Sequence, residues 1–276
     1  MTPKISVIFT TYNEPEWLEK VIWGFSVQSF NNFEVVIADD GSSGETKAVI
    51  ERLTKEVDFP IQHVWHEDDG FRKCDILNKA IVKAKADYLV FTDGDCIPRK
   101  DFLETHYNHR QKNKFLSGGL IRLPLDLSKA ITKDDIINQR IFNDKWLAEN
   151  GLKLGYSKRL RLSGNAFTKS TMNNITPTNA SWNGHNSSTW KKHVLEANGF
   201  DERMKYGGQD REFGERLMNA GIKGKQIRFN AICMHLDHAR GYVTKEDWER
   251  NYQIRENTRK NKVTRTLYGI EKMHNS

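Results

Sequence analysis

The sequence predicts an α/β domain built on a mostly parallel sheet with helices on both faces, followed by a helical tail. Short, almost continuously apolar strands alternate with amphipathic helices along the amino-terminal part of the chain. Polar and acidic residues follow several of these strands, at the sheet edge where α/β proteins bind ligands. The chain has 276 residues, 37% of them hydrophobic, and can therefore bury one substantial core.

The amino-terminal part shows the more regular pattern. Its strand segments are rich in β-branched and aromatic residues and end in polar turns. Its helical segments place apolar side chains three or four residues apart. In order, the pattern predicts strands over residues 5–10, 33–38, 61–65 and 88–91, separated by helices over residues 17–25, 46–53 and 73–85.

Beyond residue 115 the pattern loosens, and no internal repeat or low-complexity tract is visible. Charged and apolar residues still alternate at helical or strand spacing. The elements expected here are a short strand after Gly118-Gly119, a charged helical excursion over 129–156, a strand and turn within 180–221 leading into a helix at 210–220, a strand over 227–236, and a basic helix over 245–268.

Asp93-Gly94-Asp95 follows the predicted strand over 88–91. Two aspartates that are two residues apart on an extended segment can point their carboxylates the same way. Paired carboxylates attract Mg²⁺ or Mn²⁺, especially together with substrate phosphates. A short acidic motif also fits a plain turn, so its position after a buried strand is what favours a metal site.

Several motifs occur in a specific order. The chain reads Ser6-Val7-Ile8, Thr11-Tyr12-Asn13-Glu14, then Val36-Ile37-Ala38-Asp39-Asp40-Gly41-Ser42, then Asp93-Gly94-Asp95. With these motifs it resembles the family 2 glycosyltransferases of the GT-A fold, a Rossmann-like fold, over residues 4–240. The later motif Tyr206-Gly207-Gly208-Gln209-Asp210-Arg211-Glu212-Phe213 is similar to the carboxyl-terminal galactosyltransferase-type module.

The resemblance implies a division of the chain and an activity. Residues 1–244 would form the GT-A domain, with a nucleotide-binding half (1–115) and an acceptor and catalytic half (116–244), and residues 245–276 a basic helical tail. The activity implied is hexosyl transfer from a nucleotide sugar, a UDP-sugar, to a hydroxyl of a glycan or lipid-linked glycan acceptor. The implied setting is bacterial cell-surface polysaccharide or lipopolysaccharide synthesis, with Mn²⁺ or Mg²⁺ as cofactor.

The resemblance also implies donor-binding residues. Thr10 and Tyr12 would line the nucleotide pocket, and Asp40 would accept a hydrogen bond from the uracil ring. Arg72 would lie near the diphosphate, and Asp93 would face the ribose and donor sugar. Asp40 also fits a helix-capping turn, and the alternative for Arg72 is a plain surface charge.

Asp210 is the expected general base, because an inverting transfer needs a carboxylate that takes the proton of the attacking hydroxyl. The resembling motif usually reads Glu-Asp, whereas this chain has Gln209-Asp210, which puts the donor-sugar contact of Gln209 in doubt. Gly184 belongs to a segment similar to the family's Gly-Gly-Asn-x-Ser and would approach the donor sugar. Trp182 offers an aromatic face to a sugar ring, although a tryptophan is more often a core residue.

His235 and His238 lie three residues apart at the end of the last predicted strand. Neutral imidazoles at this spacing can reach one ion, although such a pair is more often a surface feature. The resemblance implies that both join Asp95 as metal ligands.

The expected reaction is a direct displacement that inverts the anomeric configuration. One alternative is a nucleotidyltransferase that makes a nucleotide sugar, but the turn at residues 10–15 lacks the glycine-rich loop expected of one. The other is a non-catalytic glycan-binding module. Titration of uridine diphosphate with and without Mn²⁺ distinguishes both alternatives from a transferase.

The remaining features bear on location and partners. Cys74, Cys96 and Cys233 are widely spaced and odd in number, which suits packing residues in a reducing compartment. We expect a cytoplasmic protein that binds no nucleic acid. Much of the net charge of +7 follows residue 245, so the tail could dock on an anionic inner membrane; the alternative is a helix packed on the domain.

Overall fold

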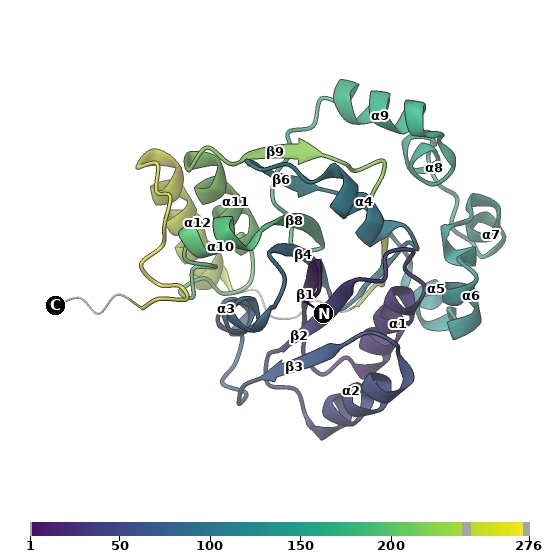
Figure 1. Ribbon diagram of the computed structural model, residues 1–276, viewed down its shortest axis with the longest axis horizontal. Helices are drawn as coiled ribbons and strands as arrows, with labels where there is room; N and C mark the ends of the chain where they lie inside the picture. Colours follow the sequence, from purple (N-terminus) through teal and green to yellow (C-terminus); the bar gives the residue numbers. More distant parts are fainter. Residues whose placement is uncertain (1, 239–243, 273–276) are drawn as a thin grey trace.

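The computed structural model describes residues 2–238 and 244–272 (Figure 1). A seven-stranded sheet runs through the molecule in the order β3-β2-β1-β4-β8-β6-β9. Strands β1 to β4 are parallel, β8 runs antiparallel to β4 and β6, and β9 is parallel to β6. The mostly parallel sheet is therefore confirmed. Its strands are β1 (Ile5–Thr11), β2 (Phe33–Asp39), β3 (Ile61–Trp65), β4 (Tyr88–Asp93), β6 (Lys114–Ser117), β8 (Asn186–Trp190) and β9 (Lys223–Gln226).

Helices cover both faces of this sheet, as predicted. One face packs α1 (Pro15–Ser26), α2 (Gly44–Glu56) and α4 (Phe102–His109) in one apolar core. The opposite face packs α3 (Lys73–Lys83), α10 (Lys191–Glu196) and α11 (Gln209–Asn219) in a second core. The sheet between two cores explains why its central strands are apolar throughout.

The register of the parallel strands brings their polar ends to one edge. Thr10 of β1 lies opposite Asp93 of β4, and Thr11 lies opposite Asp39 of β2. Residues that are far apart in the sequence therefore meet where the strands end.

A second, three-stranded sheet has the order β5-β10-β7. Its strands are β5 (Cys96–Pro98), β7 (Gly119–Arg122) and β10 (Ile232–His235). The strand predicted over 227–236 is shorter than expected, because only residues 232–235 form it, as β10, and the preceding strand β9 belongs to the other sheet. Between them the chain turns, with the backbone N–H groups of Asn230 and Ala231 both donating to the carbonyl of Ile227 at 2.9 Å.

The helical excursion predicted over 129–156 is a series of short helices rather than one. Thr132 caps a new helix with a capping box, Gln139 has a left-handed φ of 56°, and the Asn143 side chain caps the next helix. Each of these features lies at the start of a new helical segment. The elements are α5 (Leu125–Ala130), α6 (Lys133–Ile137), a 3-10 helix (Arg140–Phe142), α7 (Asp144–Glu149), α8 (Tyr156–Ser163) and α9 (Ala166–Ile175).

The carboxyl-terminal segment packs on the rest of the domain. Helix α12 (Lys245–Lys260) is shorter than the helix predicted to residue 268. After it, Thr266 donates through Oγ1 to Asp201 at 2.7 Å, and Asn198 donates to the carbonyl of Thr266 at 2.8 Å. Among the described helices, none combines the length and the apolar character that a bilayer-spanning segment requires.

Asn251 of α12 ties the helix to the turn that precedes α11. Its Nδ2 group donates to the carbonyls of Lys205, Tyr206 and Gly207 at 3.2, 3.1 and 2.7 Å, and the side chain is 2% exposed. The Lys205–Gly207 backbone is thus held by one amide.

We predict that Asn251→Ala lowers the free energy of unfolding by about 1–3 kcal/mol, because it leaves buried carbonyls without their donor. Urea unfolding followed by circular dichroism measures this. Gln253→Ala removes an exposed amide from the same helix and should change stability little. An equal loss in both variants would contradict the role given to Asn251.

Candidate active site

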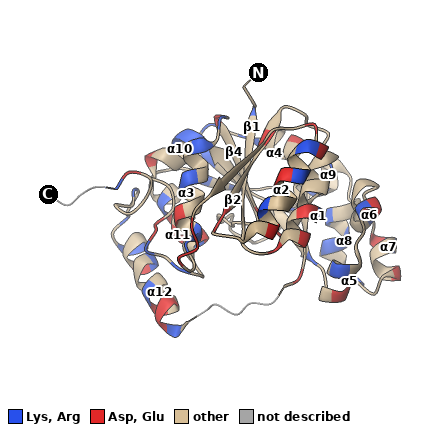
Figure 2. Ribbon diagram, turned by 90° about the horizontal axis from the view of Figure 1, so that it is seen from below, with Lys and Arg blue, Asp and Glu red and all other residues tan. Residues whose placement is uncertain are grey.

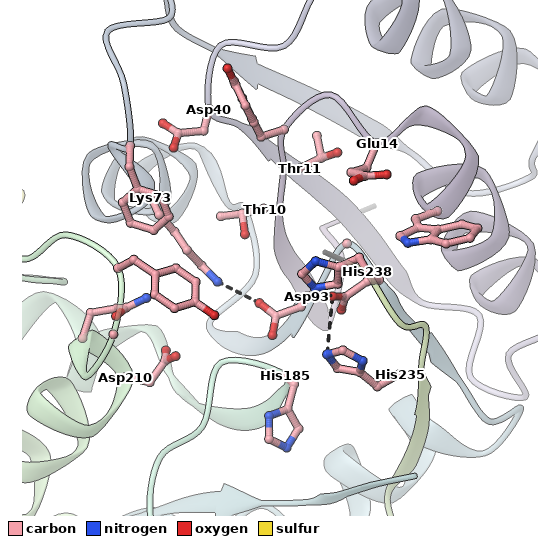
Figure 3. Close-up of a pocket in the computed structure, with 18 of the residues that line it drawn as sticks. Thr10, Thr11, Glu14, Asp40, Lys73, Asp93, His185, Asp210, His235 and His238 are labelled. Atoms are coloured by element: carbon pink, nitrogen blue, oxygen red, sulfur yellow. Dashed lines mark hydrogen bonds and ion pairs between the residues drawn. The ribbon is translucent and has the colours of Figure 1, made fainter. Parts of the chain in front are cut away.

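A cavity of about 630 Å³ opens where β1, β2 and β4 end (Figure 3). Its walls come from the β1–α1 turn, the segment after β4, the turn before α11 and the end of β10. The lining residues are Thr10, Thr11, Tyr12, Glu14, Trp17, Asp40, Gly70, Phe71, Lys73, Asp93, Gly94, Asp95, Leu120, Arg122, His185, Tyr206, Gly207, Gly208, Gln209, Asp210, His235 and His238.

Asp40 lies at one end of the cavity, directly after β2. Its Oδ1 is 2.7 Å from His66 Nε2, and its Oδ2 accepts from the backbone N–H of Arg72 at 3.0 Å. Burial raises the pKa of Asp40, while these two partners oppose the shift. Each carboxylate oxygen keeps a further lone pair, so Asp40 can still accept a hydrogen bond from a ligand.

Lys73 and Asp93 form an ion pair in the middle of the cavity, with Nζ and Oδ1 2.9 Å apart (Figure 3). Burial works against the charge of Lys73, but Asp93 and Asp210 outweigh it and raise the pKa of the amine. Lys73 therefore supplies a fixed positive charge at the centre of the site.

Gly94 separates Asp93 from Asp95 at a point of close backbone approach. Its N–H donates to the carbonyl of Thr10 at 3.1 Å. A Cβ atom at this position would lie 2.5 Å from that carbonyl oxygen, which is too close for any side chain. The glycine thus lets both aspartates reach the cavity.

Asp95, His235 and His238 place three ligand atoms close together. Asp95 Oδ2 is 3.5 Å from His235 Nε2 and 3.0 Å from His238 Nε2. The antiparallel pairing of β5 with β10 sets this arrangement, because it puts His235 opposite Cys96, the residue after Asp95. The backbone N–H of Leu236 also donates to the carbonyl of Asp95 at 2.8 Å.

The cluster fits a divalent cation. Ligands about 2.1 Å from a metal and at right angles to each other lie about 3 Å apart, close to the observed separations. A donor set of one carboxylate and two imidazoles suits a first-row transition ion, including Mn²⁺, better than Mg²⁺, which prefers oxygen ligands.

Asp210 lies across the cavity from this cluster, in the first turn of α11 (Figure 3). Gly207 and Gly208, which precede the helix, have φ angles of 98° and 88°, a region that favours glycine. Burial raises the pKa of Asp210 to about 6, while Lys73 and the backbone N–H of Gly184 hold the shift back. The carboxyl group is thus placed and tuned to exchange a proton near neutral pH.

Comparison with known proteins identifies the family to which this chain belongs. The sequence profile of the family described as Glycosyl transferase family 2 matches residues 6–170, more than half of the chain. The chain belongs to glycosyl transferase family 2.

Relatives of this glycosyltransferase share the same enzyme class. The uncharacterized glycosyltransferase YfnE of Bacillus subtilis is 26% identical over 273 residues, covering 90% of this chain and 68% of its own length. The chondroitin synthase of Escherichia coli is 25% identical over 242 residues, 84% of this chain. This glycosyltransferase spans only 34% of that synthase.

Solved structures share the GT-A fold. The mannosyltransferase PcManGT of Pyrobaculum calidifontis, in complex with GDP-Man and Mn²⁺, is similar with a TM-score of 0.56 and 18% identity over 91% of this chain and 61% of its own. TarS 1-349 of S. aureus in complex with UDP-GlcNAc has a TM-score of 0.59 and 16% identity, over 91% of this chain and 65% of its own.

The structure corrects three sequence expectations for the glycosyltransferase. Trp182 is fully buried against Phe91 and Phe213, so its face is not available to a sugar. Arg72 pairs with Asp75 and does not line the cavity; Lys73 lies there instead.

Gly184 is the third correction, because it does not line the cavity either. A Cβ atom there would lie 2.8 Å from Asp210 Oδ2, so Gly184 supports that carboxylate from behind. Gln209 does line the cavity, and its Oε1 is buried without a hydrogen-bond partner among the described residues.

Several residues in or beside the cavity carry no motif that sequence reasoning could use. His66, which holds Asp40, and Arg122, at the end of β7, are isolated in the sequence. His185 lies between Trp182 and β8, and burial lowers its pKa to about 4, which keeps it neutral. Only the strand pairing shows that Arg122 and His235 are neighbours.

We predict that Gly94→Ala weakens binding of Mn²⁺ and of uridine diphosphate at least about tenfold, because the new Cβ must displace the Asp93–Asp95 turn from Thr10. Isothermal titration calorimetry measures both. Gly44→Ala, at a position with nothing within 4 Å of the new Cβ, is the matched control. Equal affinities in both variants would contradict the close-approach argument.

Proposed function

We propose that this glycosyltransferase moves a hexosyl group from a UDP-sugar to a hydroxyl of a glycan acceptor, with Mn²⁺ as cofactor and with inversion at the anomeric carbon. The observation that carries this proposal is the arrangement of one cavity. It has a buried carboxylate acceptor at one end, a three-ligand cation cluster on one wall, and a carboxyl group of raised pKa on the opposite wall.

The nucleotide would occupy the end of the cavity near Asp40. There Asp40 would accept the ring N–H of uracil, with Thr10 and Tyr12 beside it. The Tyr12 hydroxyl donates to Asp68 at 3.0 Å and leaves the ring face open at 42% exposure, suited to a flat base.

The diphosphate would lie over the cation cluster and near Lys73. A divalent cation held by Asp95, His235 and His238 would neutralise charge on the departing nucleoside diphosphate. Asp93, which already pairs with Lys73, would face the ribose and donor sugar. Gln209, with its unpaired amide oxygen, would accept a hydroxyl of that sugar.

Asp210 would act as the general base. Its ionised carboxylate would take the proton of the acceptor hydroxyl as the hydroxyl oxygen forms a bond to the anomeric carbon and the bond to the nucleoside diphosphate breaks. A single displacement of this kind inverts the anomeric centre and requires no enzyme-bound sugar.

The similarity to polysaccharide synthases supports a glycan acceptor. The chondroitin synthase of Escherichia coli and the hyaluronan synthase of Pasteurella multocida are both among the relatives. The cellular setting that fits is synthesis of a bacterial cell-surface polysaccharide. The family assignment weighs against both alternatives, a nucleotidyltransferase and a non-catalytic glycan-binding module.

A screen of nucleotide sugars tests the proposal. Release of nucleoside diphosphate is measured for UDP-, GDP- and TDP-sugars, with Mn²⁺ present, and the product of the active donor is then examined for anomeric configuration. Turnover of a UDP-sugar with inversion supports the proposal. Binding without turnover of any donor, or a retained configuration, would refute it.

We predict that Asp210→Asn lowers kcat by about 10²–10⁴-fold while leaving donor affinity nearly unchanged, because the amide cannot accept the proton. In the wild type, kcat should rise with pH through about 6, as Asp210 loses its proton. The groups facing it are Lys73, Asp93 and Arg211.

The matched control is Asp87→Asn, which removes an exposed carboxylate far from the cavity lining and should keep full activity. Steady-state rates between pH 5 and 9 would supply the profile. A rate that does not depend on Asp210 would assign the base elsewhere.

We predict that chelation with EDTA abolishes transfer and that Mn²⁺ restores it better than Mg²⁺, because two of the three ligands are imidazoles. His238→Ala should raise the Mn²⁺ concentration needed for half-maximal rate at least about tenfold. His109→Ala, on α4 outside the cavity, should leave it unchanged. Full activity in EDTA would exclude the cation cluster from the reaction.

A further inference from the structure

Helices α8 and α9 form a hairpin at the periphery of the molecule, beyond α7 and away from the central sheet (Figure 1). Neither helix contains a buried residue, which sets this α8–α9 hairpin (residues 156–175) apart from the helices that cover the sheet. It is nevertheless fixed in place. Asn173 donates to the Asn230 side chain, at 2.5 Å, and Arg161 donates to the carbonyl of Leu120, at 3.1 Å.

The hairpin exposes large apolar side chains. Tyr156 is 77% exposed, Phe167 is 81% exposed and Ile175 is 62% exposed. Isolated exposed apolar residues are ordinary, but three on two adjoining short helices without a fully buried residue indicate a surface that binds a partner.

The sequence of the hairpin and of several other segments is basic, although Arg159 of α8 pairs with Asp144 of the adjacent α7 at 2.8 Å. Residues 150–195 contain seven lysines and arginines and no acidic residue. Residues 105–125 and 216–236, which supply β6, β7, β9 and β10, also lack acidic residues. These three stretches hold fifteen of the 43 lysines and arginines and none of the 36 acidic residues. In Figure 2, α8 accordingly carries blue segments and no red ones.

We propose that the α8–α9 hairpin docks on an anionic lipid bilayer, with Tyr156, Phe167 and Ile175 entering the interface and Lys153 and Lys158 facing the headgroups. Both lysines are exposed. Basic helices that also present aromatic and aliphatic side chains have the composition of interfacial membrane-binding segments. An anionic polymer would account for the lysines but would leave the apolar side chains without a partner.

Helix α12, to which the sequence assigned this role, fits it less well. Trp248 and Tyr252 are exposed and stack on each other. However, residues 245–276 contain five acidic residues beside eight basic ones. Arg250 pairs with Asp247, and Arg255 pairs with Glu215 on α11 at 2.6 Å. These pairs and the acidic residues of the tail neutralise part of its positive charge.

The hairpin also adjoins the acceptor half of the site. Leu120, whose carbonyl accepts from Arg161, lines the cavity beside Arg122. Docking through the hairpin would thus place a membrane surface near the cavity, which suits an acceptor carried on a lipid. This consequence rests on the proposed function, whereas the docking itself does not.

Co-sedimentation with lipid vesicles tests the proposal without donor or acceptor. The probes are vesicles of equal parts phosphatidylglycerol and phosphatidylcholine, and vesicles of phosphatidylcholine alone. Two hairpin variants are compared with wild type: Tyr156→Ser with Phe167→Ser, and Lys153→Glu with Lys158→Glu. The matched control on α12 is Trp248→Ser with Tyr252→Ser.

Wild type and the α12 control should sediment with the anionic vesicles and not with the neutral ones. Each hairpin variant should show a partition coefficient lower by at least about tenfold, since one basic residue near such a surface contributes about fivefold. All the substituted side chains are exposed, and thermal unfolding together with uridine diphosphate binding establishes that the variants are folded.

Three results would overturn the proposal. Wild type that does not sediment with anionic vesicles, or hairpin variants that sediment as well as wild type, would refute docking at this surface. If Lys153→Glu with Lys158→Glu abolishes sedimentation but Tyr156→Ser with Phe167→Ser does not, the partner is a soluble polyanion and not a bilayer. Failure of nucleotide-sugar turnover with intact sedimentation would count against the proposed function alone.

Discussion

The antiparallel pairing of β5 with β10 is the interaction on which the rest of the site depends. It joins the segment after β4, in the amino-terminal half of the chain, to the end of the last strand. Asp95 immediately precedes β5 and His235 ends β10, so the register of two short strands decides whether a carboxylate and an imidazole meet. A slip of one residue would turn His235 to the other face of its strand. The cation cluster is therefore a property of strand register as much as of the acidic motif.

A second constraint is the electrostatic balance among Lys73, Asp93 and Asp210. Burial raises the pKa of Asp210 to about 6, above its value in an unfolded chain, so the folded state binds this proton more tightly. The contribution of Asp210 to the free energy of unfolding is then greatest at low pH. It falls as the pH rises toward 6 and the carboxyl group ionises. At neutral pH the protein holds a carboxylate that burial disfavours, with Lys73 as partial compensation. Such a cost is expected where a buried group must accept a proton.

Sequence reasoning reached the fold and the centre of the site but not its supporting residues. The apolar strands and the acidic ends of β2 and β4 were visible because each is a local pattern. Asp210 was predicted because the motif over residues 206–213 resembles a known module. Trp182 was misassigned, because burial against Phe91 depends on a contact between distant segments. Lys73 and Arg72 are adjacent, and only the start of α3 decides which one enters the cavity.

Acidic and basic residues are unevenly distributed around the cavity. Acidic residues gather where the chain needs carboxylates for hydrogen bonds to His66, for the Lys73 pair and for the cation cluster. The segments that form β6, β7 and β9 contain basic residues and no acidic ones. The two regions meet at β7, where Leu120 receives a hydrogen bond from the hairpin and Arg122 lines the cavity. Because β7 pairs directly with β10, the strand that receives the hydrogen bond from the hairpin also lies beside the strand that carries His235.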